Sequence, residues 1–142
     1  MLRAYAFKPI FRRAAVAHGA NARMVGGIAL QETNADPTKD SPDGGWGMMQ
    51  LTRQRGVRRA QAHDPAFAID YAAALLAKNS RRIAAKFPQF SPADRLLATA
   101  ASHNLGPNKF SGNPATIDEG SIPNGRYGHN VLALMNCFPP SW

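Results

Sequence analysis

The chain has 142 residues, and its 17 Lys and Arg against 9 Asp and Glu give a formal net charge of +8. This length suits one domain over residues 1–142 with a single hydrophobic core. No apolar run approaches the roughly 20 residues of a membrane-spanning helix, so we expect no transmembrane segment. The basic balance predicts attraction to polyanions, such as an anionic envelope surface or nucleic acid, without choosing between them.

The N-terminal segment lacks the apolar block of a secretory signal peptide. Lys8, Pro9, Arg12 and Arg13 interrupt every apolar stretch there. The sequence therefore predicts a protein that is made in the cytoplasm without a signal peptide. Cys137 is the single cysteine, so we expect a fold without disulfides in which this thiol is a small buried apolar group.

The predicted elements are almost all helices. Asp64–Pro65 and Ser91–Pro92 combine a capping side chain with a first-turn proline, and Asn21 is a further cap. Strand signals are scarce, so any sheet should be a small hairpin between Asp36 and Leu51. The fold class is therefore mainly α, with helices expected in chain order over residues 8–18, 21–32, 64–83, 91–104 and 127–138.

Two adjacent glycines, Gly26 and Gly27, lie inside the second predicted helix. Each should cost roughly 1 kcal/mol relative to alanine in a helix interior. Because glycine has no side chain, a neighbour that packs closely against the helix would explain why both glycines are present. We therefore expect another backbone, or the substrate, to approach the helix at this point.

Glu32 is the most informative residue because it ends an apolar helical stripe. Val25, Ile28 and Ala29 precede it by seven, four and three positions, on the same helix face. A carboxyl group held against a core is partly desolvated, which raises its pKa and keeps it protonated for general acid catalysis. The alternative is an ordinary solvated glutamate at a helix end.

Three short segments carry motifs. The first has an acid and a hydroxyl residue at Glu32–Thr33, followed by a turn-rich loop that closes with GMMQ at Gly47–Gln50. The others are AASHNLGP at Ala100–Pro107 and YGHNVL at Tyr127–Leu132. In this order they resemble the motifs of lytic transglycosylases and goose-type lysozymes. The resemblance implies a lysozyme-like helical domain that cleaves the MurNAc-β-1,4-GlcNAc bond in the glycan strands of bacterial peptidoglycan.

The same resemblance implies roles for individual residues. Glu32 would be the catalytic residue, acting first as general acid and then as base, with no metal and no other cofactor. Tyr127 would orient the Glu32 carboxyl, and His103 stands where the family usually has tyrosine. Trp46 is either a platform for a sugar ring or a half-buried anchor of the loop. The candidate substrate-binding residues are Thr33, Trp46, Met49, Gln50, His103, Asn104 and Tyr127.

One departure from the motifs bears on the reaction. Goose-type lysozymes that hydrolyse carry an aspartate two positions after the motif glutamine, and this chain has Thr52 there. The departure favours a lytic transglycosylase that leaves 1,6-anhydro-MurNAc ends. The alternative is a hydrolytic lysozyme acting on the same bond, which would need a second carboxylate from Asp36, Asp40 or Asp43.

Other functional classes fit less well. Residues Arg12 to Leu30 can be read as a helix-turn-helix, but the second helix is apolar where a recognition helix presents polar side chains to bases, so we expect no specific nucleic acid partner. The four histidines form no paired-ligand motif, so we expect no metal.

The biological context follows from the charge and the N-terminus. A basic, unanchored, single-domain wall enzyme resembles the endolysins of bacteriophages, antimicrobial proteins that act in host cell lysis. The expected protein is a monomer that reaches the cell wall in the periplasm after release from the cytoplasm. A virion-borne or secretion-system enzyme is the alternative.

Overall fold

The protein, seen here as a computed structural model, is described over residues 1–142 apart from the side chain of Gln54. Two isolated bridges, Asp40 with Trp46 and Trp46 with Leu51, are the only β pairings among the described residues. The expected mainly α fold with at most a small hairpin is confirmed. The helices are α1 (Leu2–Ala6), α2 (Lys8–His18), α3 (Ala22–Thr33), α4 (Arg59–Ala62), α5 (Pro65–Lys86), α6 (Pro92–Leu105) and α7 (Tyr127–Met135), with short 3-10 helices η1 (Arg53–Arg55) and η2 (Pro114–Thr116).

The local start signals predicted the long helices well. The side chains of Asn21, Asp64 and Ser91 each accept a hydrogen bond from a backbone N–H in the first turn of α3, α5 and α6. The last helix ends at Met135 rather than at Phe138. Helices α1 and α4 were not predicted, because elements this short show no apolar periodicity.

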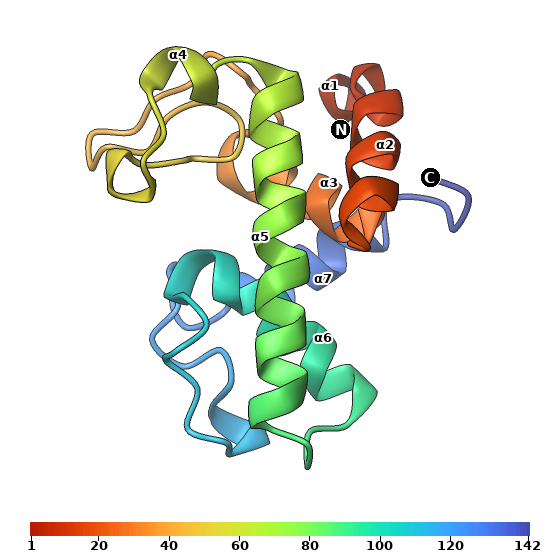
Figure 1. Cartoon of the computed structure of the whole chain (residues 1–142), viewed down its shortest axis with the longest axis vertical. Coiled ribbons are helices and arrows are strands. Elements are labelled where there is room, and N and C mark those ends of the chain that lie inside the picture. Colours follow the sequence, from red (N-terminus) through yellow and green to blue (C-terminus); the bar gives the residue numbers. More distant parts are fainter.

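Helix α5 is the central element of the fold (Figure 1). Helices α1 to α3 and the segment 34–62, which includes α4, lie along its N-terminal half, whereas α6 and the loop 106–126 lie along its C-terminal half. Helix α7 packs against both α3 and α6 and so joins the two halves. The larger apolar cluster surrounds α3, and a smaller one containing Ile83, Phe90 and Phe110 fills the other half.

The two glycines of α3 permit close packing. A Cβ atom on Gly27 would lie 2.8 Å from the backbone oxygen of Val131 in α7, and one on Gly26 would lie 2.6 Å from the Trp142 ring. The expected close approach is confirmed, and its partners are α7 and the C-terminal segment. Since residues 24–29 are all buried, α3 has no face free to enter a DNA groove, which contradicts the helix-turn-helix interpretation.

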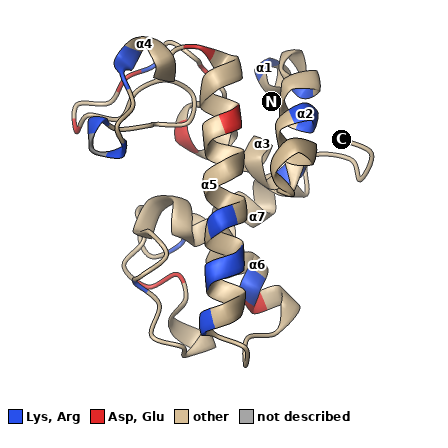
Figure 2. Cartoon of the chain, in the orientation of Figure 1, with Lys and Arg blue, Asp and Glu red and all other residues tan. Residues whose placement is uncertain are grey.

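Three groups of basic residues, which begin at Arg12, Arg53 and Lys78, lie on different parts of the structure (Figure 2). Arg12 and Arg13 are exposed on α2, the segment 53–59 belongs to the long loop and the start of α4, and the cluster 78–86 follows the C-terminal half of α5. Cys137 is exposed after the end of α7, so the prediction of a buried thiol is wrong. No described helix is both long enough and apolar enough to span a membrane.

Candidate active site

The C-terminal end of α3 places Glu32 at the surface of the core. The helix stops after Thr33, where Asn34 and Ala35 adopt positive φ angles of 57° and 58°. The Thr33 hydroxyl donates to the Met48 carbonyl oxygen at 3.1 Å and accepts the Asp36 N–H at 3.0 Å, so it fastens the helix end to the following loop. The Glu32 side chain remains 18% exposed.

A short hydrogen bond holds the Glu32 carboxyl. The Tyr127 hydroxyl donates to Oε1 of Glu32 at 2.5 Å. Burial and the adjacent Glu32 raise the pKa of Tyr127 well above its usual value, so the hydroxyl stays protonated and acts as the donor. With Oε1 engaged in this bond, Oε2 is the oxygen available to carry the proton of the neutral carboxyl.

The environment of Glu32 favours its protonated form. Burial raises the pKa of Glu32 and outweighs the Tyr127 hydrogen bond and the Arg55 charge, which lower it, while the Asp43 charge raises it further. A general acid must be protonated to act, so activity should decline as the pH rises through this elevated pKa.

His103 lies beside Glu32 as an uncharged group. Its Nε2 is 3.1 Å from the Met49 carbonyl oxygen, which can only accept, so Nε2 carries the hydrogen. The same nitrogen is 3.8 Å from Oε1 of Glu32, too far for a hydrogen bond. Burial, followed by the Arg55 charge, lowers the pKa of His103 to about 4, so the ring is neutral at neutral pH.

Glu32 opens into a pocket of about 230 Å³. Its walls come from the end of α3, the long loop and η1 on one side and the end of α6 on the other. Arg55 donates from its guanidinium to the His103 carbonyl oxygen at 3.2 Å, which links these two sides. The residues lining the pocket are Glu32, Ser41, Asp43, Gly45, Gln50, Thr52, Arg55, His103 and Asn104.

The structure brings some of the predicted substrate-binding residues together and not others. Gln50, His103 and Asn104 line the pocket with Glu32, and Tyr127 lies behind the carboxyl. Thr33 and Met49 are buried and do not line this pocket, and the Thr33 hydroxyl bonds to the loop instead.

Trp46 and Asn104 have different surroundings. Trp46 is half-buried against the core and exchanges backbone hydrogen bonds with Leu51, as a loop anchor would, and it is absent from the pocket lining. Asn104 accepts the Ile122 N–H at 2.9 Å through Oδ1, which leaves its amide nitrogen for a ligand.

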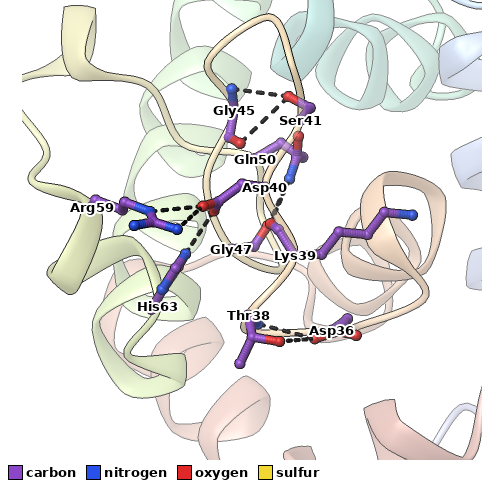
Figure 3. A network of polar contacts seen from close by, with 10 residues as sticks. All are labelled: Asp36, Thr38, Lys39, Asp40, Ser41, Gly45, Gly47, Gln50, Arg59 and His63. Atoms are coloured by element: carbon purple, nitrogen blue, oxygen red, sulfur yellow. Dashed lines mark hydrogen bonds and ion pairs between the residues drawn. The ribbon is translucent and has the colours of Figure 1, made fainter.

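A polar network shapes the loop that forms one wall (Figure 3). Asp40 forms an ion pair with Arg59 and a hydrogen bond with the His63 ring, each at 2.6 Å. The Gln50 amide donates to the carbonyl oxygens of Lys39 and Gly47 at 3.1 and 3.0 Å. The loop is therefore held in place by contacts that do not involve a ligand.

The same contacts distinguish the three aspartates considered for a second carboxylate. Asp36 pairs with Arg3 at 2.7 Å, and Asp40 is occupied by Arg59 and His63. Neither Asp36 nor Asp40 lines the pocket that contains Glu32. Asp43 does line the pocket, where it accepts a hydrogen bond from Ser41.

Arg55 and Ser41 are pocket residues that sequence reasoning missed. Arg55 lies in the basic run 53–59, and nothing in its local sequence separates it from the exposed residues Arg53, Arg58 and Arg59. Its contact with the His103 carbonyl oxygen joins positions far apart in the chain. Only the folded arrangement could reveal it.

Comparisons with known proteins agree with this geometry. Residues 9–116, more than half of the chain, match the family model described as the transglycosylase SLT domain. Over 105 residues the chain is 35% identical to the membrane-bound lytic murein transglycosylase F of Desulfosudis oleivorans. That match covers 70% of this chain and 22% of the relative, so the chain spans about a fifth of the relative's length. The chain belongs to the family of transglycosylase SLT domains.

Proposed function

We propose that this protein cleaves the MurNAc-β-1,4-GlcNAc bond of peptidoglycan as a lytic transglycosylase, with Glu32 as the catalytic residue. The observation that carries the proposal is a partly buried carboxyl with a raised pKa, held by Tyr127 at the base of a pocket in a chain of this family. Such a group keeps its proton to higher pH than an ordinary glutamate, so it can deliver that proton to a leaving sugar oxygen.

In the first step, the Oε2 hydroxyl of Glu32 protonates the glycosidic oxygen. The bond between this oxygen and C1 of MurNAc breaks, GlcNAc leaves with a free 4-hydroxyl, and positive charge develops at C1 and the ring oxygen. Glu32 becomes a carboxylate at this point. The Tyr127 hydrogen bond and the Arg55 charge both favour the ionised form of Glu32, so they stabilise the carboxylate between the first and the second step.

In the second step, the Glu32 carboxylate takes the proton of the MurNAc 6-hydroxyl while O6 bonds to C1. The product is a 1,6-anhydro ring, Glu32 is protonated again, and no water is consumed. One carboxyl thus serves as acid and base. The Gln50 amide, from the wall formed by the long loop, and the Asn104 amide, from the wall formed by the end of α6, line the same pocket. These amides suit the acetamido and hydroxyl groups of a glycan strand.

Hydrolysis is the second candidate reaction, and Asp43 is the observation that favours it. Asp43 shares the pocket with Glu32, and its charge contributes to the raised pKa of Glu32. An inverting hydrolase uses a second carboxylate to activate water on the opposite face of the sugar. This would leave reducing MurNAc ends in place of anhydro ends.

Mass spectrometry of purified peptidoglycan after digestion tests the reaction. We expect fragments ending in 1,6-anhydro-MurNAc, in the wild type and also in Asp43→Asn. Reducing MurNAc ends that disappear in Asp43→Asn would instead assign hydrolysis to Glu32 and Asp43. Absence of both kinds of fragment, from a wall that a known muramidase digests, would overturn the enzymatic proposal.

We further propose that the protein acts as a monomeric phage endolysin, made in the cytoplasm and released to the periplasmic wall during host cell lysis. The net charge of +8 supports this role through attraction to an anionic envelope. Expression in a Gram-negative cell should cause lysis when a membrane pore is co-expressed and little without one. The matched control is Glu32→Gln with the same pore. Equal lysis by this variant, or lysis by the wild type without a pore, would contradict the role.

A further inference from the structure

The first turn of α7 is held by the loop that precedes it. The N-cap residue Arg126 makes no side-chain capping bond. Instead, the Tyr127 N–H donates to the Ser121 hydroxyl at 2.9 Å, and the N–H groups of Gly128 and His129 donate to the Asp118 carboxylate at 2.9 and 3.0 Å. The first three N–H groups of the helix, which have no partner within it, are all satisfied in this way.

The Asp118 carboxylate is the centre of this arrangement. It also accepts the Ser121 hydroxyl at 2.7 Å and Nδ1–H of His129 at 2.8 Å, and its side chain is 4% exposed. Burial would raise the pKa of Asp118, but the hydrogen bonds from His129, Gly128 and Ser121 lower it below the usual value. Asp118 is therefore an anion at the positive end of α7, where a negative charge is stabilised.

Tyr127 connects these contacts to the active site. Asp118 holds the Ser121 hydroxyl, Ser121 holds the backbone of Tyr127, and the Tyr127 hydroxyl donates to Glu32 at 2.5 Å. Neither Asp118 nor Ser121 lines the pocket that contains Glu32. Because Tyr127 is the first residue of α7, its placement depends on how that helix end is fixed.

We propose that Asp118 and Ser121 are positioning residues that hold the Tyr127 hydroxyl against the Glu32 carboxyl. For catalysis the proposal rests on the proposed function, whereas the placement of Tyr127 can be measured without it. A residue that caps α7 only for stability would leave the Glu32 carboxyl unaffected after correct folding. A positioning residue would change the titration of Glu32.

The direction of that change follows from the donor. The Tyr127 hydroxyl stabilises the carboxylate form of Glu32, so losing this bond raises the pKa of Glu32 further. The other titratable or charged groups that influence Glu32 are His103, Arg55 and Asp43, and none of them contacts Asp118. His129 is the remaining titratable partner of Asp118, and its side chain is 50% exposed.

The experiment compares Asp118→Asn, Tyr127→Phe and the double variant. The pKa of Glu32 is measured by NMR titration of its side-chain carboxyl carbon, and kcat is measured against pH on peptidoglycan. We expect Asp118→Asn to move the titration of Glu32 to higher pH, as Tyr127→Phe does, and to lower kcat by about 10-fold or more. In the Tyr127→Phe background, Asp118→Asn should change neither value further.

A matched control separates positioning from stability. Asp94 caps α6 through a reciprocal capping box with Ser91, so Asp94→Asn removes a helix-capping carboxylate in the same half of the molecule. It should lower the melting temperature without moving the Glu32 titration. If Asp118→Asn folds poorly, Ser121→Ala is the second variant. It keeps the Asp118 carboxylate, removes the bonds of the Ser121 hydroxyl to the Tyr127 N–H and to Asp118, and should move the titration in the same direction.

Three results would overturn the proposal. One is a Glu32 titration that is unchanged in folded Asp118→Asn or in folded Ser121→Ala. Another is a decrease in kcat caused by Asp118→Asn that is as large in the Tyr127→Phe background as in the wild type. The third is an equal titration shift in Asp94→Asn. If the wild type cleaves no peptidoglycan, the proposed function fails, and the NMR comparison still decides the placement of Tyr127.

Discussion

Replacing Glu32 with Gln is expected to lower the rate of glycan cleavage by about 1,000-fold. Glutamine keeps the shape of the side chain and can still accept the Tyr127 hydrogen bond, but it has no acidic proton to transfer and no carboxylate to take one back. The release of soluble fragments from purified peptidoglycan measures the loss. Because burial disfavours the charged form of Glu32, the free energy of unfolding should be unchanged or slightly higher in this variant.

The chain offers a matched control for this substitution. Glu119 is the only other glutamate, and it is exposed on the loop before α7, outside the lining of the active-site pocket. Glu119→Gln makes the same chemical change and should retain wild-type activity. If Glu32→Gln also retained it, the proton would have to come from another group, and the assignment of the catalytic residue would be wrong.

Replacing Gly47 with Ala is expected to lower the free energy of unfolding by about 3 kcal/mol, the upper end for a steric clash combined with backbone strain. Gly47 has a φ of +66°, and a Cβ atom there would lie 2.0 Å from the Ala62 carbonyl oxygen and 3.2 Å from that of Pro37. Both contacts are with backbone, which cannot rotate away as a side chain can. Urea denaturation followed by circular dichroism measures the change.

The same substitution should also weaken activity, because the Gly47 carbonyl oxygen accepts a hydrogen bond from the Gln50 amide and Gln50 lines the pocket. Gly44→Ala is the control: its φ is +93°, and no atom lies within 4 Å of the added carbon. Backbone strain alone should then cost about 1 kcal/mol. Equal stability of the two variants would mean that the loop moves freely and that the contact with Ala62 is not required.

The sequence predicted the helices because their signals are local. Caps at Asn21, Asp64 and Ser91 and apolar residues at helical spacing act within one or two turns, and the structure confirms each of these starts. The sequence also predicted that Glu32 ends an apolar helix face. Burial of the Glu32 carboxyl raises its pKa, as expected from that position. The two glycines inside the predicted helix also indicated that another part of the chain packs closely against Gly26 and Gly27.

The sequence predicted only some of the residues that line the pocket. Asp36, Asp40 and Asp43 are equivalent as loop residues in the sequence, but their partners are Arg3, Arg59 with His63, and Ser41. Met49 belongs to a motif, but the loop directs its side chain into the core. The partner of each aspartate and the direction of the Met49 side chain depend on which distant residues the fold brings near. A local sequence pattern does not contain that information.

By itself, then, the sequence determined the mainly helical fold, the helix starts and the residue type and placement of the candidate acid, because propensity, capping and periodicity act over a few residues. Only the tertiary structure decided that His103 is neutral, that Arg55 and Asp43 share the pocket with Glu32, and that Asp118 supports Tyr127. Each of these depends on burial and on hydrogen bonds between residues far apart in the chain. Desolvation and charge act through space, so they become defined only when the chain has folded.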